Sequence, residues 1–214
     1  MIKAEVNVTG RIKRNAAIRT DKSGKPYVAF IMAVTLTDPK TTTNDVDIFV
    51  SVPDGTQADL AMYTENTRVT ISGSMDVKKK DDNLALYLTA NLLTTEGVAE
   101  LDSITGELSF RGHLRNEKVY EEKSDKNGNP FLVFSAYSAE KVGENFVSTW
   151  VNFRRFPDKD AGIDTIKPAW MQPKARVSIK GDFQLESYNG KARISSRVRE
   201  MEQYVPQPFN GYNH

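Results

Sequence analysis

Apolar and polar residues alternate along most of this chain, and the alternation occurs twice in similar segments. In AEVNVTGRIKR near the N-terminus and in GELSFRGHLRN near the middle of the chain, apolar residues stand at every second position. A period of two predicts a half-buried β-strand. Each segment has a glycine on its apolar face, Gly10 or Gly112, which is typical of a bend where a small barrel turns a corner. The pattern therefore predicts corresponding first strands in two similar units.

A turn that leads into a strand follows in both halves. The segment DKSGKPYVAF at residues 21–30 corresponds to DKNGNPFLVF at residues 125–134, with Asp, Lys, Gly, Pro and the final Phe at matching places. The Asp-x-x-Gly stretch has turn chemistry, and a proline is tolerated at the first residue of a strand. Both segments predict a turn and a second strand.

Three further segments recur in the same order. DIFVSV is matched by STWVNF, which aligns Phe49 with Trp150. RVTISG, starting at Arg68, is matched by RVSIKG, starting at Arg176, and the segments LALYLTANLL and KARISSRVREM follow them. A helix-like connector, TQADLAMYTEN or the proline-interrupted IDTIKPAWMQP, separates the third strand from the fourth. Five landmarks in one order, found twice, indicate a tandem duplication.

Five short strands with a helix between the third and fourth are the plan of the OB-fold, a small and partly open barrel. We therefore predict an all-β protein with a short helix per domain, built from tandem five-stranded OB-fold barrels over residues 1–98 and 104–204. The boundary falls in GVAELDSIT, near residues 97–105. Residues 205–214, with two prolines, are expected to form a mobile C-terminal tail.

Each half resembles the DNA-binding domain of the bacterial single-stranded-DNA-binding proteins. The resemblance lies in V-x-V-x-G-R-I and its second copy F-R-G-H-L, in S-G-K-P before a strand ending A-F-I-M-A-V, in the aromatic of the third strand, and in R-V-T-I-S-G. It covers residues 4–94 and 106–203. In some members of that family two such domains share one chain and two chains form a four-barrel assembly. The resemblance thus implies single-stranded DNA as the partner and a homodimer with four OB-folds in total.

The alternation in the predicted strands decides which side chains face outward. In both third strands the aliphatic residues form the inner face, which leaves Phe49 and Trp150 on a polar outer face. A large aromatic side chain in that place exposes apolar area and usually has a partner. Other aromatic and cationic side chains are also predicted to face outward: Tyr27, Phe131 and Tyr137 on the second strands, Arg11, Lys13, Arg111 and Arg115 on the first strands, Arg154 beside Trp150, and Arg193, Arg197 and Arg199 on the last strand.

Aromatic side chains fringed by cations suit unpaired nucleic acid. Bases stack on aromatic rings with little regard to sequence, at about 1–3 kcal/mol each, and cations follow the phosphates. We therefore expect sequence-tolerant single-stranded DNA binding, in DNA replication, DNA recombination or plasmid or phage DNA metabolism. The larger number of outward cations in the second unit predicts tighter binding there.

A second interpretation remains open, in which the duplicated barrels form a structural or protein-interaction module without nucleic-acid binding. The outer aromatics would then be buried against a partner chain or cap a barrel end. The net charge of +1 favours this interpretation, as does the final segment YVPQPFNGYNH, which lacks the acidic tip that the resembled family uses to recruit other enzymes. RNA binding is a further alternative, because it differs only through contacts to the 2′-hydroxyl.

Two other polar features have plain structural interpretations. The lysines at residues 78–80, beside Asp81 and Asp82, are expected to lie in a solvated turn, and His113 is expected to be an exposed strand residue.

Composition argues against catalysis and against bound cofactors. The chain has no cysteine and two histidines, which leaves no disulfide, no thiolate metal site and little basis for a histidine-built one. It contains no phosphate-binding loop, nucleophile elbow or H-E-x-x-H motif. Asp45 and Asp47 share an outer face, but the second unit has no counterpart, so no metal site is predicted. We expect a non-enzymatic protein without cofactors.

The N-terminal segment MIKAEVNVTG has no apolar run of signal-peptide length, and no later stretch approaches the length of a membrane span. A cytoplasmic location is therefore expected.

Overall fold

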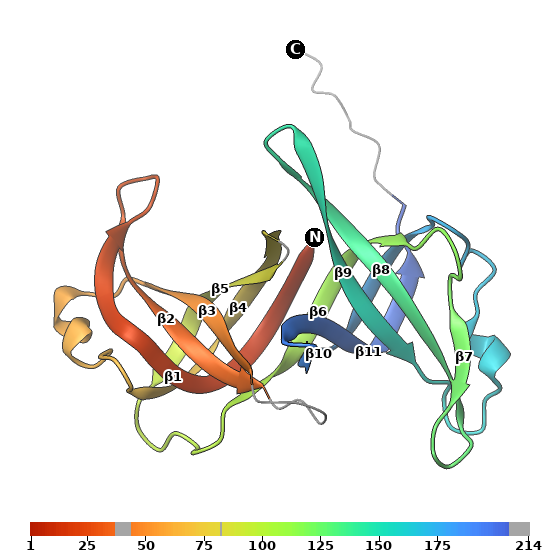
Figure 1. Ribbon diagram of the computed structural model, residues 1–214, viewed down its shortest axis with the longest axis horizontal. Coiled ribbons are helices and arrows are strands. Elements are labelled where there is room, and N and C mark those ends of the chain that lie inside the picture. Colours follow the sequence, from red (N-terminus) through yellow and green to blue (C-terminus); the bar gives the residue numbers. More distant parts are fainter. Residues whose placement is uncertain (37–43, 82, 206–214) are drawn as a thin grey trace.

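The computed structural model describes residues 1–36, 44–81 and 83–205 of the 214-residue chain (Figure 1). Apart from Val205, the predicted mobile tail lies outside the described residues. The first half contains five strands and one short 3₁₀ helix. Their order along the chain is β1 (Ile2–Thr20), β2 (Pro26–Leu36), β3 (Asn44–Pro53), η1 (Gln57–Ala61), β4 (Arg68–Lys80) and β5 (Asn83–Thr94).

The second half repeats this order with one additional strand segment: β6 (Ser103–Leu114), β7 (Glu121–Ser124), β8 (Pro130–Val142), β9 (Asn145–Arg155), η2 (Ile163–Ile166), β10 (Arg176–Tyr188) and β11 (Lys191–Gln203). The predicted short helices are single 3₁₀ turns. A capping box between Thr56 and Asp59 starts η1, and η2 ends just before Pro168, which lacks the N–H that a longer helix would need. No helix among the described residues is long and apolar enough to cross a membrane.

All described strands form one sheet that closes on itself twice. The strand order is β2-β3-β5-β4-β1-β6-β10-β11-β9-β8-β7, and additional β1–β2 and β6–β8 pairings close the two barrels. In each unit the third strand pairs in parallel with the last, β3 with β5 and β9 with β11. The protein is therefore all-β, and each half has the strand arrangement of an OB-fold barrel.

The first strand of the second unit is split, which the sequence did not predict. β7 pairs with β8 through Ser124 and Pro130, just as the end of β1 pairs with β2 through Thr20 and Pro26. β7 thus occupies the place of the second half of β1. The register of β1 itself shifts twice between Ile12 and Ala17. Both first strands are irregular at this corner, and in the second unit the irregularity separates β6 from β7.

The repeated motif RVTISG/RVSIKG ends in a glycine at a tight point of each barrel. The β4–β5 register shifts between Ser72 and Gly73, and the β10–β11 register shifts between Lys180 and Gly181. A Cβ atom at Gly73 would meet the Thr89 carbonyl oxygen across the ladder. A bulge with glycine lets the strand bend sharply enough to close a small barrel. The two units therefore share this backbone requirement of barrel closure.

The core follows the predicted alternation. Val46, Ile48 and Val50 are buried on β3, and in the second unit the Phe110 and Phe134 rings both pack on Phe153 with centroids 5.2 Å apart. Burial of a phenylalanine side chain stabilises the fold by about 1.5–3 kcal/mol.

Thr9 interrupts the alternation of buried and exposed residues along β1. It is only 5% exposed, because it lies between Thr70 of β4 and Ser103 of β6, and its hydroxyl is 2.9 Å from that of Thr70.

The two units are joined through their first strands. β1 and β6 form an antiparallel ladder from the Ile2–Phe110 pair to the Thr9–Ser103 pair, so the barrels lie side by side (Figure 1). The N-terminal amine of Met1 donates to the carbonyl oxygen of Arg111 at 2.9 Å. The first unit is thereby hydrogen-bonded to the second along most of this ladder.

The segment between β5 and β6 is held against the first barrel. The carboxylate of Asp102, 8% exposed, accepts a hydrogen bond from the Thr35 amide at 2.9 Å and pairs with Arg68 at 2.9 Å. Arg68 Nε also donates to the carbonyl oxygen of Ala99 at 3.0 Å. The division into domains at residues 1–98 and 104–204 stays a prediction.

Candidate nucleic-acid interface

Phe49 and Trp150 point out of their barrels. Their side chains are 42% and 49% exposed, while Ile48 and Val50 beside Phe49, and Val151 beside Trp150, are buried. Alternate residues of a strand face opposite sides of the sheet, so burial of the neighbours directs both rings outward. The predicted outward placement is confirmed, whereas the role of the rings in binding stays a prediction.

Phe49 has an aromatic neighbour that the sequence analysis missed. The parallel β3–β5 pairing places Tyr87 opposite Phe49, and the two rings are stacked with centroids 5.4 Å apart and planes 23° apart. Tyr87 is exposed between the buried Leu86 and Leu88. The same alternation that identified Phe49 would have identified Tyr87 on the last strand.

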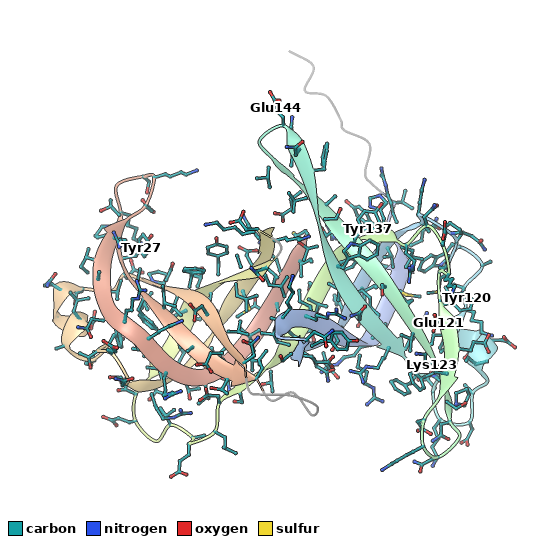
Figure 2. The ribbon with its side chains drawn as sticks, viewed as in Figure 1. Tyr27, Tyr120, Glu121, Lys123, Tyr137 and Glu144 are labelled. Atoms are coloured by element: carbon teal, nitrogen blue, oxygen red, sulfur yellow. The ribbon has the colours of Figure 1, made fainter. Side chains whose placement is uncertain are left out.

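In the second unit the aromatic neighbours come from different strands. Tyr137 of β8 lies opposite Trp150 of β9, with ring centroids 5.0 Å apart, and on its other side it stacks on His113 at 5.6 Å. Figure 2 shows Tyr137 part-way along the long β8–β9 hairpin. Burial, followed by the positive charges of Arg176 and the N-terminus, lowers the pKa of His113. The lowered pKa favours the neutral imidazole, which extends this row of rings.

Tyr27 and Phe131 do not join these two aromatic groups. Tyr27 is half-buried near the start of β2, opposite Pro53, and lies near the upper end of the first unit in Figure 2. Phe131 is also half-buried and stacks on Phe156 with centroids 4.9 Å apart. These placements fit the alternative that both cover a barrel end.

The cations of the first strands differ in their surroundings. Arg11 and Arg115 are exposed. Lys13 donates to both carboxylate oxygens of Asp47 at 2.8 and 2.9 Å, which offsets its charge. The Arg111 guanidinium lies over the ring of Tyr204 at 5.1 Å. Some of the predicted outward cations therefore already interact with other side chains of the protein.

The other predicted cations of the second unit show the same mixture. Arg154 of β9 pairs with Glu186 at 2.8 Å. On β11, Arg197 lies over the Phe156 ring at 5.0 Å and Arg193 over the Tyr188 ring at 4.0 Å.

Arg199 is exposed, as predicted. It nevertheless has acidic partners, because it bonds to Glu107 of β6 at 3.2 Å and to Asp182 of β10.

The two carboxylates of the outer face of β3 also have partners. Asp45 accepts a hydrogen bond from the Thr35 hydroxyl at 2.8 Å, and Asp47 holds Lys13. In the part of the chain that the structure describes, no three His, Asp or Glu side chains gather closely enough to hold a metal ion.

Comparisons with known proteins yield similarities of structure only. No family model and no curated protein sequence matches the chain. Among solved structures, the chain is similar to the single-stranded DNA binding protein from Thermus aquaticus, with 10% identity, a TM-score of 0.44, and coverage of 96% of this chain and 94% of that one. It is also similar to the mitochondrial single-stranded DNA binding protein Rim1 from S. cerevisiae, with 19% identity, a TM-score of 0.36, and coverage of 48% and 96%. Identities and TM-scores this low carry no functional conclusion.

Proposed function

We propose that this protein binds single-stranded DNA without strong sequence preference, performs no chemistry and needs no cofactor. Its setting is the cytoplasm, in DNA replication, recombination or plasmid or phage DNA metabolism. The observation that carries the proposal is that Phe49 and Trp150 are exposed on the corresponding third strands of two OB-fold barrels. Each of the two rings lies beside a tyrosine ring, Tyr87 of β5 or Tyr137 of β8.

Stacking is the interaction that these groups support best. An exposed ring on a strand presents a flat apolar face to which any base can bind, and each stacked base contributes about 1–3 kcal/mol. Exposed cations near the rings, including Arg115 and Arg193, would neutralise phosphates. Affinity should therefore fall with salt, with a slope of about −0.7 per neutralised phosphate on a log–log plot.

A fluorescence titration with oligothymidylate tests the proposal. Stacking of a base on Trp150 should quench its emission, while Trp170, packed against the core, supplies a background signal. Trp150→Phe retains a stacking ring and should bind with little quenching, which assigns the signal. If the emission stays constant and anisotropy detects no bound oligonucleotide, the proposed function is wrong. Competition by duplex DNA and by RNA at two salt concentrations measures the preference for single-stranded DNA.

The ion pairs Lys13–Asp47 and Arg154–Glu186 favour the second candidate function, a protein-interaction module. Cations that already have carboxylate partners are less available to phosphates. Gel filtration with and without oligothymidylate separates the two functions. A DNA binder shifts to larger size with the oligonucleotide, whereas an interaction module elutes unchanged. The same experiment tests the proposed homodimer, which should elute at twice the 24.0 kDa of one chain.

A further inference from the structure

A groove between the two units connects their aromatic groups. Its central hollow, of about 480 Å³, lies between the β4–β5 hairpin of the first unit and strands β9 and β11 of the second, and Trp150 is part of its wall. An adjoining hollow of about 400 Å³ shares Asn83 and Lys191 with the central one and reaches Phe49. The two hollows are therefore neighbours, and together they border both exposed rings.

The centre of this groove is cationic. The described residues that line it include four cations and no carboxylate: Lys79, Arg115, Lys191 and Arg193. The adjoining hollow is lined by Lys80 and by the carboxylates of Asp45, Asp47 and Asp81. Because the described carboxylates line the adjoining hollow and not the central one, the groove is most positive between the two units.

Hydrogen bonds across the unit boundary hold the walls of the groove together. Asn44 of β3 donates through its side-chain amide to the carbonyl oxygen of Gly190 at 3.1 Å. Gly190 lies in the turn between β10 and β11, where Asn189 and Gly190 have φ of 50° and 71° and make a tight reversal. This contact and the β1–β6 ladder position the lysine-bearing hairpin of the first unit against the second unit before any ligand binds.

We propose that one continuous single strand of nucleic acid crosses from the first unit to the second through this groove. Its bases stack on Phe49–Tyr87 and Trp150–Tyr137, and the phosphates between them lie against Lys80, Lys191 and Arg193. This inference deepens the proposed function and rests on it. A strand held in this way binds the two barrels as one site, because occupation of one barrel brings the strand to the other at high effective concentration.

Fluorescence anisotropy with labelled oligothymidylates of about 6 and about 20 nucleotides tests the groove, since one OB-fold covers about 4–16 nucleotides. The variant is Lys80→Ser/Lys191→Ser, two exposed side chains of the groove wall. The affinity for the long oligonucleotide should fall about tenfold and its salt slope by about 1.4, because two phosphate contacts are lost. The affinity for the short oligonucleotide should stay within about twofold, because a single barrel suffices for it.

The matched control is Lys3→Ser/Lys180→Ser, which removes the same charge from exposed sites on β1 and β10 outside the groove. It should leave the affinity for both oligonucleotides near that of the unmodified chain. If the groove variant and the control bind the long oligonucleotide with equal affinity, the proposed path through the groove is wrong. That result would not contradict binding at each barrel separately. If an oligoglutamate of equal charge displaces the long oligonucleotide at equal concentration, the groove recognises acidic peptide and the proposal is overturned. If the unmodified chain binds neither oligonucleotide, the proposed function itself fails.

Discussion

Trp150 and Phe49 are exposed to similar extents but differ in their surroundings. Trp150 borders the cationic centre of the groove, whereas Phe49 lies near Asp45 and Asp47. In the proposed complex, a base stacked on Trp150 would bring its phosphate toward cations, and a base stacked on Phe49 would bring its phosphate toward carboxylates. Trp also offers the larger ring for stacking.

Replacement of these rings should have unequal effects. Trp150→Ala is expected to weaken oligothymidylate binding by about 1–3 kcal/mol, and Phe49→Ala by less. Titration by anisotropy measures both, with Leu92→Ala, a truncation of an exposed apolar residue of β5, as the control that should leave affinity unchanged. Equal losses of affinity for the two aromatic variants would show that the surrounding charges do not make the second unit bind more tightly than the first.

At the scale of the element, the strands that carry the rings depend on bends that the glycines permit. Gly73 and Gly181 lie at equivalent register shifts, where the opposing carbonyl group approaches too closely for a side chain. The nearest atoms to a Cβ at Gly73 all belong to backbone, which cannot move without breaking the ladder. The outer face is therefore shaped partly by residues that lie far from any ligand contact.

Gly73→Ala should destabilise the fold by about 1–3 kcal/mol through overpacking. Gly162→Ala is the matched control, because a Cβ there would meet no atom within 4 Å and its φ of −76° suits alanine. The control should change stability by no more than about 0.5 kcal/mol. Denaturant unfolding of both variants measures the difference, and a Gly73→Ala protein as stable as the control would contradict the role assigned to the bulge.

At the scale of the whole molecule, the relative placement of the barrels depends on the β1–β6 ladder and on the anchored segment before β6. Burial raises the pKa of Asp102, but the hydrogen bonds from Thr35 and Arg68 outweigh burial and hold the pKa below its ordinary value of 3.8. A carboxyl group with a lowered folded-state pKa stabilises the fold fully above its ordinary pKa. That contribution is lost as the pH falls below about 4 and through the folded-state pKa.

Asp102→Asn should therefore cost about 1–3 kcal/mol at pH 7, because it leaves the buried face of Arg68 without its carboxylate. The cost should shrink as the pH falls from about 4 toward 2, where the unmodified chain loses the same contribution. Thermal unfolding across this range checks both expectations. The control Glu117→Gln alters an exposed carboxylate before β7, and it should show neither a loss of stability at pH 7 nor a change in that loss with pH. A cost for Asp102→Asn that stays constant down to pH 2 would be inconsistent with the charge-dependent anchor.

The sequence by itself determined the all-β character, the order of strands and the outward direction of Phe49 and Trp150. Each of these follows from a period of two and from turn residues, which act over a few neighbouring positions. Only the tertiary structure decided that Tyr87 stacks on Phe49, that Asp47 pairs with Lys13, that Thr9 is buried between the units and that a cationic hollow lies beside Trp150. These features depend on which strands become neighbours across long stretches of chain, and alternation along a strand carries no information about the partner on the other side.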